Sequence, residues 1–360
     1  MSDHIPKLQE LLHATEPASL ADRVHALLER QQTEWPQLAE ARDRLKLIDW
    51  RIVRYADAEL RLQHNPGRMA SSAARTDTAA VARRPCFLCP EHQPAEQQSM
   101  WFCDYRLQAN PYPIFANHLT ISARTHTPQL IGGELPLMLA LARGLGSEFS
   151  MLYNGARCGA SAPDHRHFQA GERGFLPLDT QYQALCSRHG RNLPSLRQCE
   201  VVGVDDGMRR MVLLVSDSAH DLSEAFDLLR QVLEQFGVEP THPSTRTPSD
   251  RDLTFLNRAL STPDEPMMNL LLSYERGFWR LMVFLRSRHR PDAFFALDPD
   301  RVVFSPGAVD MGGVCIFPVA RDFERVNGQE LAAMLQQVAL PQKRFGQVLE
   351  VLERRLKRRS

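Results

Sequence analysis

A short run of alternating side chains, His165-Arg166-His167-Phe168-Gln169, constrains this 360-residue chain more than any other feature. Such alternation is typical of a β-strand, because successive side chains point to opposite faces. We therefore expect His165, His167 and Gln169 to share one face. Two imidazoles and an amide in a row make little sense as packing, since buried polar groups need partners. The strand is thus a candidate functional site.

The segment before this strand, residues 154–163, is a loop of small residues. Glycine and alanine let backbone N–H groups approach an anion, and Ser161 adds a hydroxyl donor. Asn154 offers an amide suited to a ribose or phosphate oxygen. A neutral imidazole is a nucleophile whose reactive tautomer depends on what its other nitrogen binds. The pattern favours His167 as a nucleophile that attacks a nucleotide phosphate, with a structural or simple metal-binding His-x-His pair as the alternative.

Cys86 and Cys89 have the spacing of one half of a tetrahedral zinc site, which needs two further ligands. No second Cys-x-x-Cys exists, so the remaining ligands should be histidines. The histidines in range are His92, His118, His126 and His165. We favour His165, because a metal there would hold the strand beside the nucleophile, and His126, with His118 left open. The alternative is a redox pair or two small core residues.

Composition excludes several functional classes. Lysine plus arginine and aspartate plus glutamate balance at 43 each, so no global field favours nucleic acid or an anionic membrane. No apolar run approaches the roughly 18 residues of a membrane span, and the N-terminus lacks the pattern of a signal peptide. Seven cysteines, an odd number, fit a reducing compartment. We expect a cytoplasmic protein.

Mixed helical and strand-like patterns predict an α+β protein. Apolar spacing predicts several helices within 5–46, the second of them opened by Ser19 and Asp22, and further helices near 135–153 and at the C-terminus. Strands are expected over 47–64, 100–108, 118–123 and 165–170, and a hairpin over 269–288 turning at Arg276-Gly277. Residues 65–77 are expected to form a loop and 239–252 a linker.

These motifs resemble the transferase branch of the histidine-triad (HIT-like) superfamily, which includes galactose-1-phosphate uridylyltransferase, diadenosine tetraphosphate phosphorylase and the GDP-hexose phosphorylases. CFLCPEHQP, residues 86–94, is similar to the zinc-binding segment of the uridylyltransferases. Residues 159–169 resemble the G-x-S-x-P…H-x-H-x-Q signature. Residues 110–121 resemble the segment that contacts the nucleotide, and 273–287 the strands of a second copy. The resemblance spans about residues 80–320.

The resemblance implies HIT-like antiparallel sheets with flanking helices, in two tandem HIT-like halves. It implies a helical and strand extension over 1–78, a catalytic half over 79–240, and a second, degenerate half with a C-terminal helix over 250–360. Gln169 in the third triad position separates transferases and phosphorylases from the small hydrolases. Asp164 is an extra residue before His165, beside an expected zinc ligand.

The function implied is nucleotidyl transfer or phosphorolysis through a covalent nucleotidyl-His167 intermediate. The substrates would be a nucleoside diphosphate sugar or dinucleoside polyphosphate plus a phosphate or sugar-phosphate acceptor. Gln169 would bind the phosphoryl oxygens, and zinc would be structural. The family also suggests a homodimer. The residues expected to bind substrate are Asn110, Asn154, Gly159, Ser161, Arg68 and Arg157, with Arg84 as a further phosphate ligand.

Two other functions compete with this interpretation. A zinc hydrolase using a metal-bound water would need an open metal position and a carboxylate base, for which Asp164 is the obvious residue. A non-catalytic regulator would keep the fold and bind nucleotide without turnover. The presence of both His167 and Gln169 argues against the regulator.

Overall fold

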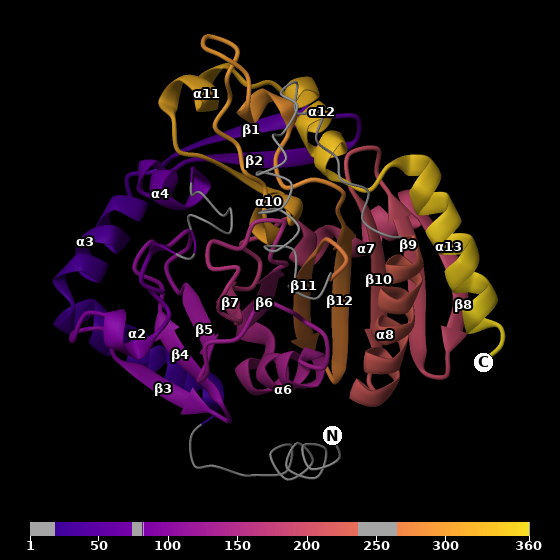
Figure 1. Ribbon diagram of the computed structural model, residues 1–360, viewed down its shortest axis with the longest axis horizontal. Coiled ribbons are helices and arrows are strands. Elements are labelled where there is room, and N and C mark those ends of the chain that lie inside the picture. The colour runs from indigo at the N-terminus through magenta and orange to yellow at the C-terminus, as the bar shows by residue number, and fades with distance from the viewer. Residues whose placement is uncertain (1–18, 74–80, 82, 237–264, 360) are drawn as a thin grey trace, which may run out of the picture.

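The computed structural model describes residues 19–73, 81, 83–236 and 265–359. A ten-stranded antiparallel sheet runs across the molecule in the order β3-β4-β5-β7-β6-β11-β12-β10-β9-β8 (Figure 1). A second sheet has the order β1-β2-β13, in which β13 runs parallel to β2. The predicted α+β class is confirmed.

The strands of the large sheet are β3 (Ser99–Phe102), β4 (Tyr105–Ala109), β5 (Leu119–Ala123), β6 (Phe149–Asn154), β7 (His167–Glu172), β8 (Gly190–Leu196), β9 (Cys199–Asp205), β10 (Arg210–Ser216), β11 (Met268–Glu275) and β12 (Phe278–Leu285). Those of the small sheet are β1 (Asp49–Tyr55), β2 (Ala58–His64) and β13 (Val314–Phe317). The helices are α2 (Leu20–Glu34), α3 (Pro36–Leu45), α4 (Met69–Ser72), α6 (Leu135–Leu145), α7 (Leu178–His189), α8 (Ala219–Gln235), α10 (Ala308–Met311), α11 (Ala320–Arg325), α12 (Gly328–Val338) and α13 (Gln342–Leu356).

The large sheet contains the same strand arrangement twice. From the centre outward, one half reads β6-β7-β5-β4-β3 and the other β11-β12-β10-β9-β8, which is the same order of connections. Each half places one helix, α6 or α8, before its central strand. The two tandem halves predicted are therefore present. The divisions at 78, 240 and 250 stay predictions, and the repeat favours a second half that begins at β8.

The second half lacks the loop that defines the first. Residues 155–166 connect β6 to β7, whereas Arg276 and Gly277 alone connect β11 to β12. Both turn residues have positive φ, 53° and 86°, as a two-residue hairpin turn of the favoured twist requires. The predicted hairpin is confirmed, and the second copy has no equivalent of the glycine-serine loop.

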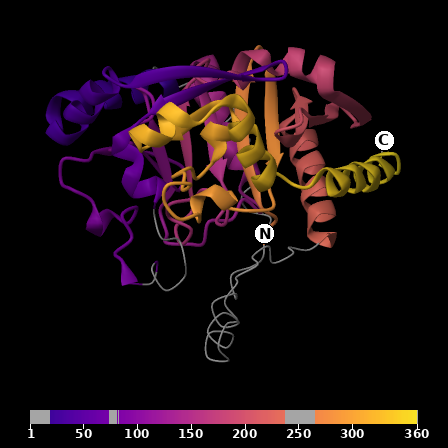
Figure 2. The ribbon, with the colours of Figure 1, turned by 90° about the horizontal axis from the view of Figure 1, so that it is seen from above.

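The large sheet buries both of its faces. On one face α2, α6, α8 and α13 pack over a core that contains Phe168 and Phe226, and Figure 1 shows α6 and α8 on the near side of the sheet. The small sheet with α7, α10, α11 and α12 covers the other face around Leu152, Phe284 and Phe317. Figure 2 shows the hairpin β1–β2 and the elements near the C-terminal end side by side, as the pairing of β2 with β13 requires. The molecule is thus layered on both sides of one sheet.

Local sequence explains how the described part of the chain begins. The Ser19 hydroxyl accepts from the Asp22 N–H at 3.1 Å, and the Asp22 carboxylate accepts from the Ser19 N–H, a reciprocal cap that starts α2 as predicted. Within the predicted loop 65–77, Pro66–Arg68 form a 3-10 turn and Met69–Ser72 form α4. Part of the predicted helix 5–46 and all of the linker 239–252 lie outside the described residues.

The helix predicted near 135–153 is wrong in its second part. Helix α6 ends at Leu145, Gly146 follows with φ of 65°, and Phe149–Asn154 form strand β6. A central strand buried on both faces is a continuous apolar run, which periodicity does not distinguish from buried helix. His165 lies just before β7, which begins at His167.

Among the described residues, no helix is both long enough and apolar enough to span a bilayer.

Strand β7 has a glycine where an aromatic ring rests on it. A Cβ on Gly171 would lie 2.0–2.5 Å from ring carbons of Phe115, and that ring is enclosed by His118 and Phe175. Gly171→Ala should therefore lower the free energy of unfolding by about 1–3 kcal/mol in urea unfolding. Gly132→Ala is the control, because nothing lies within 4 Å of its added Cβ. Equal stability of the two variants would contradict this packing.

Candidate functional site

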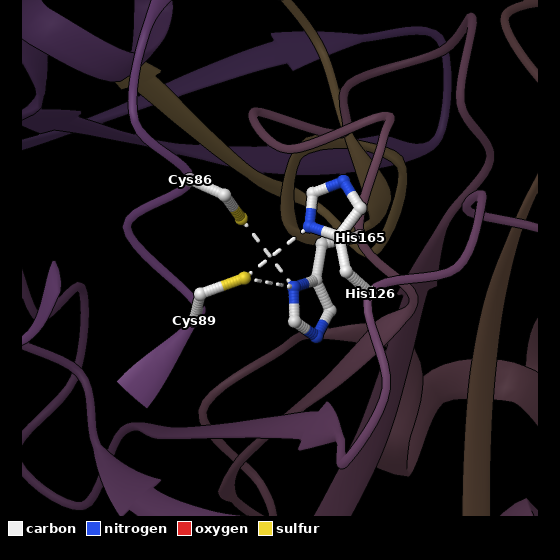
Figure 3. A group of neighbouring side chains, drawn as sticks. All are labelled: Cys86, Cys89, His126 and His165. Atoms are coloured by element: carbon white, nitrogen blue, oxygen red, sulfur yellow. Dashed lines mark hydrogen bonds between the residues drawn. The ribbon is translucent and has the colours of Figure 1, made fainter. Parts of the chain in front are cut away.

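Two cysteines and two histidines from three segments meet beside the start of β7 (Figure 3). Their ligand atoms, from Cys86, Cys89, His126 and His165, all lie within 4.8 Å of one another. Cys86 Sγ is 3.4 Å from His165 Nδ1, and Cys89 Sγ is 3.3 Å from His126 Nδ1. Bonds of roughly 2.3 Å to sulfur and 2.0 Å to nitrogen at tetrahedral angles place neighbouring ligand atoms roughly 3.5 Å apart. The group can therefore hold a metal ion.

The surroundings orient both imidazoles toward the sulfurs. His165 Nε2 lies 2.9 Å from the Ala123 carbonyl, which only accepts, so its proton is on Nε2 and Nδ1 faces the cysteines. Asp164, the extra residue, places Oδ2 3.5 Å from His126 Nε2. The extra residue therefore places a carboxylate behind His126, a candidate metal ligand, and does not displace it.

His167 begins β7 on the sheet face opposite Phe168, as the alternation predicted. Its Nδ1 is 2.8 Å from the His165 carbonyl oxygen, so Nδ1–H donates and the lone pair is on Nε2. The side chain is 4% exposed, and burial lowers its pKa to about 4. The imidazole is thus neutral at physiological pH, which is its nucleophilic form.

Gln169 follows on the same face and is oriented by a second histidine. The Ile114 N–H donates to His118 Nδ1 at 3.2 Å, which leaves the His118 proton on Nε2. His118 Nε2 then donates to Gln169 Oε1 at 2.8 Å. Burial lowers the pKa of His118 to about 3, so this imidazole is neutral. The Gln169 amide nitrogen is therefore directed away from His118.

Gln129 holds the backbone of His167, the candidate nucleophile, and sequence reasoning missed this role. Its Oε1 accepts from the His167 N–H at 2.7 Å, and its Nε2 donates to the His167 and Asn154 carbonyls at 2.9 Å each. The side chain is fully buried. It bridges the end of β6 to the start of β7. No sequence motif marks it, because the contact spans 38 residues.

A cavity of about 630 Å³, open to solvent, lies beside Gln169. All three predicted regions of the chain contribute to its wall. The lining residues are Arg68, Ser71, Ser72, Ile114, Asn154, Gly159, Ala160, Ser161, Gln169, His289, Arg290, Ser305, Gly307, Ala308, Val309, Asp310 and Ile316. Five residues predicted from sequence, Arg68, Asn154, Gly159, Ser161 and Gln169, meet here, whereas the contribution of residues 289–310 was not predicted.

Asn154 joins the two halves at this cavity. Its Oδ1 accepts from the Ala308 N–H at 2.7 Å and from Asn269 Nδ2 at 2.8 Å. Its side-chain oxygen is therefore engaged with the second half. Binding of a ribose or phosphate oxygen by Asn154 would therefore use its amide nitrogen, and this role stays a prediction.

Other predicted ligands lie elsewhere. The Asn110 amide donates to Thr120 Oγ1 and accepts from the Tyr112 N–H, so it holds its own turn. Arg157 Nη2 donates to the Glu265 carbonyl and lines a separate cavity of about 390 Å³. Arg84 Nη2 donates to the Ser161 carbonyl at 2.7 Å and so supports the loop from outside. Neither Asn110, Arg157 nor Arg84 lines the cavity beside Gln169.

Several buried polar atoms near β7 have no hydrogen-bond partner among the described residues, and two of them belong to Ser122 and Gln108. Ser122 lies directly opposite His167 across β5 and β7, and its hydroxyl is unpaired. Gln108 lies opposite Thr120 on the next strand, and its Oε1 is unpaired. Unsatisfied buried groups call for a bound water or ligand. Their position on the sheet beside His167 marks a polar surface for one.

The comparisons with known proteins identify the fold. A family model described as a domain of unknown function, DUF4922, matches residues 27–172, which is less than half of the chain. No curated protein matches the sequence. The crystal structure of yeast Ap4A phosphorylase Apa2 is similar at 15% identity with a TM-score of 0.55, covering 87% of this chain and 97% of that one. Its complex with AMP gives a TM-score of 0.52 at 15% identity, covering 87% and 96%. The predicted HIT-like fold is confirmed.

Loss of the Gln129 side chain should destabilise the protein. Gln129→Leu keeps the volume but leaves the buried His167 N–H and two carbonyls without partners, so we expect a loss of about 2–4 kcal/mol in denaturant unfolding. Gln37→Leu, at an exposed position on α3, is the matched control and should change stability by less than about 0.5 kcal/mol. A Gln129 variant as stable as this control would show that the contact contributes little.

Proposed function

We propose that this protein is a nucleotidyltransferase of the phosphorylase type that acts through a covalent nucleotidyl-His167 intermediate. The observation that carries the proposal is the bond from His167 Nδ1–H to the His165 carbonyl, which leaves the Nε2 lone pair as the reactive atom. Gln169 and the glycine-serine loop supply donors beside it. The donor substrate would be a nucleoside diphosphate sugar or a dinucleoside polyphosphate.

In the first step, His167 Nε2 forms a bond to the α-phosphorus as the bond from that phosphorus to the bridging oxygen breaks. The electron pair leaves with a sugar phosphate or a nucleoside polyphosphate. In the second step an oxygen of the acceptor phosphate or sugar phosphate attacks the same phosphorus, and the P–N electron pair returns to Nε2. No group is oxidised or reduced, and the imidazole is regenerated.

Phosphoryl transfer depends mainly on positioning and charge neutralisation. The amide nitrogen of Gln169, oriented by His118, would donate to a nonbridging oxygen of the transferred phosphoryl group. An amide binds this oxygen without taking a proton from water, which favours transfer over hydrolysis. Ser161, the Gly159 backbone and Arg68 would bind the phosphates beyond it.

Two further observations support a nucleotide substrate. Ser122 and Gln108 present unpaired buried polar atoms on the sheet near His167, where the nucleoside would contact them. The similar yeast protein is a phosphorylase of Ap4A and was also crystallised with AMP. A cytoplasmic location and a homodimer stay predictions.

We propose zinc as the metal of Cys86, Cys89, His126 and His165, because two thiolates and two imidazoles at tetrahedral spacing are a preferred zinc donor set. Bound there, zinc would fix the 86–89 loop against the start of β7. Four protein ligands complete the tetrahedron and leave no open position for a reactive water. The arrangement therefore favours a structural metal and disfavours the zinc-hydrolase alternative.

The covalent step is tested by intact-mass spectrometry. Protein incubated at mildly alkaline pH with nucleoside diphosphate sugars and dinucleoside polyphosphates, without acceptor, should gain one acid-labile nucleotidyl group. His167→Asn should abolish this gain, whereas His220→Asn, at a side chain 79% exposed, should retain it. Absence of an adduct with every nucleotide tried would overturn the mechanism, and binding without turnover would favour the non-catalytic regulator.

The metal is tested by elemental analysis and thermal unfolding. Purified protein should contain about one zinc per chain, and Cys86→Ser should lose most of it and unfold several degrees lower. Cys103→Ser, at an exposed cysteine outside the metal group, should change neither. Wild-type protein without zinc would refute the proposal. Turnover that stops at once on chelation, while the fold persists, would instead favour a metal-activated water.

A further inference from the structure

The outer wall of the cavity beside Gln169 belongs to the second half. Arg290 and Ser305 lie there, facing Arg68, Ser72 and Ser161 of the earlier part of the chain. Sequence patterns assigned no role to Arg290 or Ser305. The inference below rests on the proposed function and concerns what the far end of the same cavity binds.

Arg290 is held in place by contacts on several sides. Its Nε donates to Ser305 Oγ at 2.9 Å, and its Nη2 donates to the Ser72 carbonyl at 3.0 Å. The guanidinium carbon lies 4.1 Å from the centre of the Phe294 ring. A planar guanidinium that is already oriented loses little side-chain entropy on binding an oxyanion. Arg290 is thus a preorganised donor at the cavity wall.

A second arginine reaches the cavity from the other end of the chain. Arg68 Nη1 donates to the Tyr112 carbonyl at 2.8 Å. Burial lowers the pKa of both Arg68 and Arg290 to about 10, so both stay charged at neutral pH in a poorly solvated place. Burial gives each of these cations a desolvation cost, and an anion bound in the cavity would reduce it.

The acid in the wall, Asp310, is already engaged within the second half. Its two carboxylate oxygens accept from the Gly307 N–H at 2.8 Å and the Ile316 N–H at 2.9 Å. Burial raises its pKa to about 6. Asp310 therefore shapes the 307–316 segment and only partly offsets the charge of the two arginines.

The chemistry of the wall selects phosphate over a second nucleoside. Serine hydroxyls, guanidiniums and the Gln169 amide are donors that suit phosphate oxygens. Among the described residues that line the cavity there is no phenylalanine, tyrosine or tryptophan on which a base would stack. The cavity is thus equipped for tetrahedral oxyanions.

We infer that this cavity is the subsite for the acceptor phosphate, and that Arg290 of the second half, oriented by Ser305, binds that phosphate together with Arg68. The acceptor is a phosphate dianion, either inorganic phosphate or the phosphate of a monoester. Held there, one of its oxygens forms the bond to the α-phosphorus as the bond to His167 Nε2 breaks. With inorganic phosphate the product is a nucleoside diphosphate.

The experiment separates loading of His167 from its discharge. Nucleoside 5′-phosphorimidazolides of the four common bases transfer their nucleotidyl group with imidazole as the leaving group, so they load the enzyme without using the phosphate subsite. Loaded enzyme is then mixed with inorganic phosphate, glucose 1-phosphate or neutral hydroxylamine in a rapid-quench instrument. Arg290→Ala should load like wild type but discharge to phosphate about 10- to 100-fold more slowly at subsaturating phosphate. Discharge to hydroxylamine should be unchanged.

Matched variants keep the result interpretable if Arg290→Ala folds poorly. Arg290→Lys retains the charge without the planar donor pair and should fall between wild type and Arg290→Ala. Ser305→Ala leaves the guanidinium but removes its Nε partner, and should raise the KM for phosphate severalfold. Arg288→Gln, two residues away in an ion pair with Asp292, should behave as wild type.

Inorganic phosphate and glucose 1-phosphate are compared to identify the source of the acceptor phosphate. The acceptor of the physiological class should discharge the wild-type enzyme faster, and its discharge rate should fall more in the Arg290 variants. Phosphate discharge with unchanged rate and KM in all Arg290 variants would overturn the inference and leave the proposed function intact. If no phosphorimidazolide loads His167, the proposed function fails. Calorimetric titration with inorganic phosphate alone then decides the subsite, since binding must weaken at least tenfold in Arg290→Ala and not in Arg288→Gln.

Discussion

The antiparallel pairing of β6 with β11 is the interaction on which the rest of this molecule depends. It runs from Ser150 opposite Ser273 to Asn154 opposite Asn269 and joins two five-stranded halves into one sheet. Each strand is hydrogen-bonded to its neighbour across the whole sheet, so neither half has an unpaired edge strand at the centre. The pairing also ends at Asn154, where the glycine-serine loop begins. The joint between the halves is therefore also one wall of the candidate site.

A buried arginine, Arg286, connects the end of this strand pair to two loops of the second half. Arg286 follows β12 and donates to the side chain of Asn269, to the Pro306 carbonyl, and to the carbonyls of Arg288 and His289. Asn269 in turn donates to Asn154 Oδ1. One guanidinium thus ties two loops, 288–290 and 305–307, to the end of the central strand pair. Its charge is satisfied by carbonyl dipoles, so the loops must adopt one arrangement for the arginine to be tolerated in the interior. The second half has no glycine-serine loop of its own between β11 and β12, and it shapes the cavity of the first half through these contacts.

The sequence carried the local features of the site but not its long-range contacts. Alternation at residues 165–169 predicted the face shared by His167 and Gln169, and the Cys-x-x-Cys spacing with His126 and His165 predicted the metal group, because both are written in short stretches of chain. Sequence patterns missed Gln129, and His118 as the partner of Gln169, since their contacts with β7 span 38 and 51 residues and carry no motif. Asn110 and Arg157 stay predicted substrate ligands. The Asn110 amide holds its own turn, and Arg157 donates to the carbonyl of Glu265, 108 residues away. The helix predicted near 135–153 was wrong over β6. A strand that is buried on both faces has no alternation of polar and apolar residues by which the sequence could reveal it.

Three separate sets of contacts meet at β7, and their geometry supports the proposal that His167 is a nucleophile. Cys86 and Cys89 contact the His165 imidazole before the strand, Gln129 bonds both backbone groups of His167, and His118 orients Gln169 two residues later. His165 has a double role, because its imidazole faces the cysteines while its carbonyl accepts from His167 Nδ1. A metal bound by His165, as we propose, would therefore also fix the carbonyl that sets the tautomer of His167. In the proposed mechanism the lone pair on Nε2 depends on this carbonyl, so metal binding and the reactivity of His167 would be linked through it.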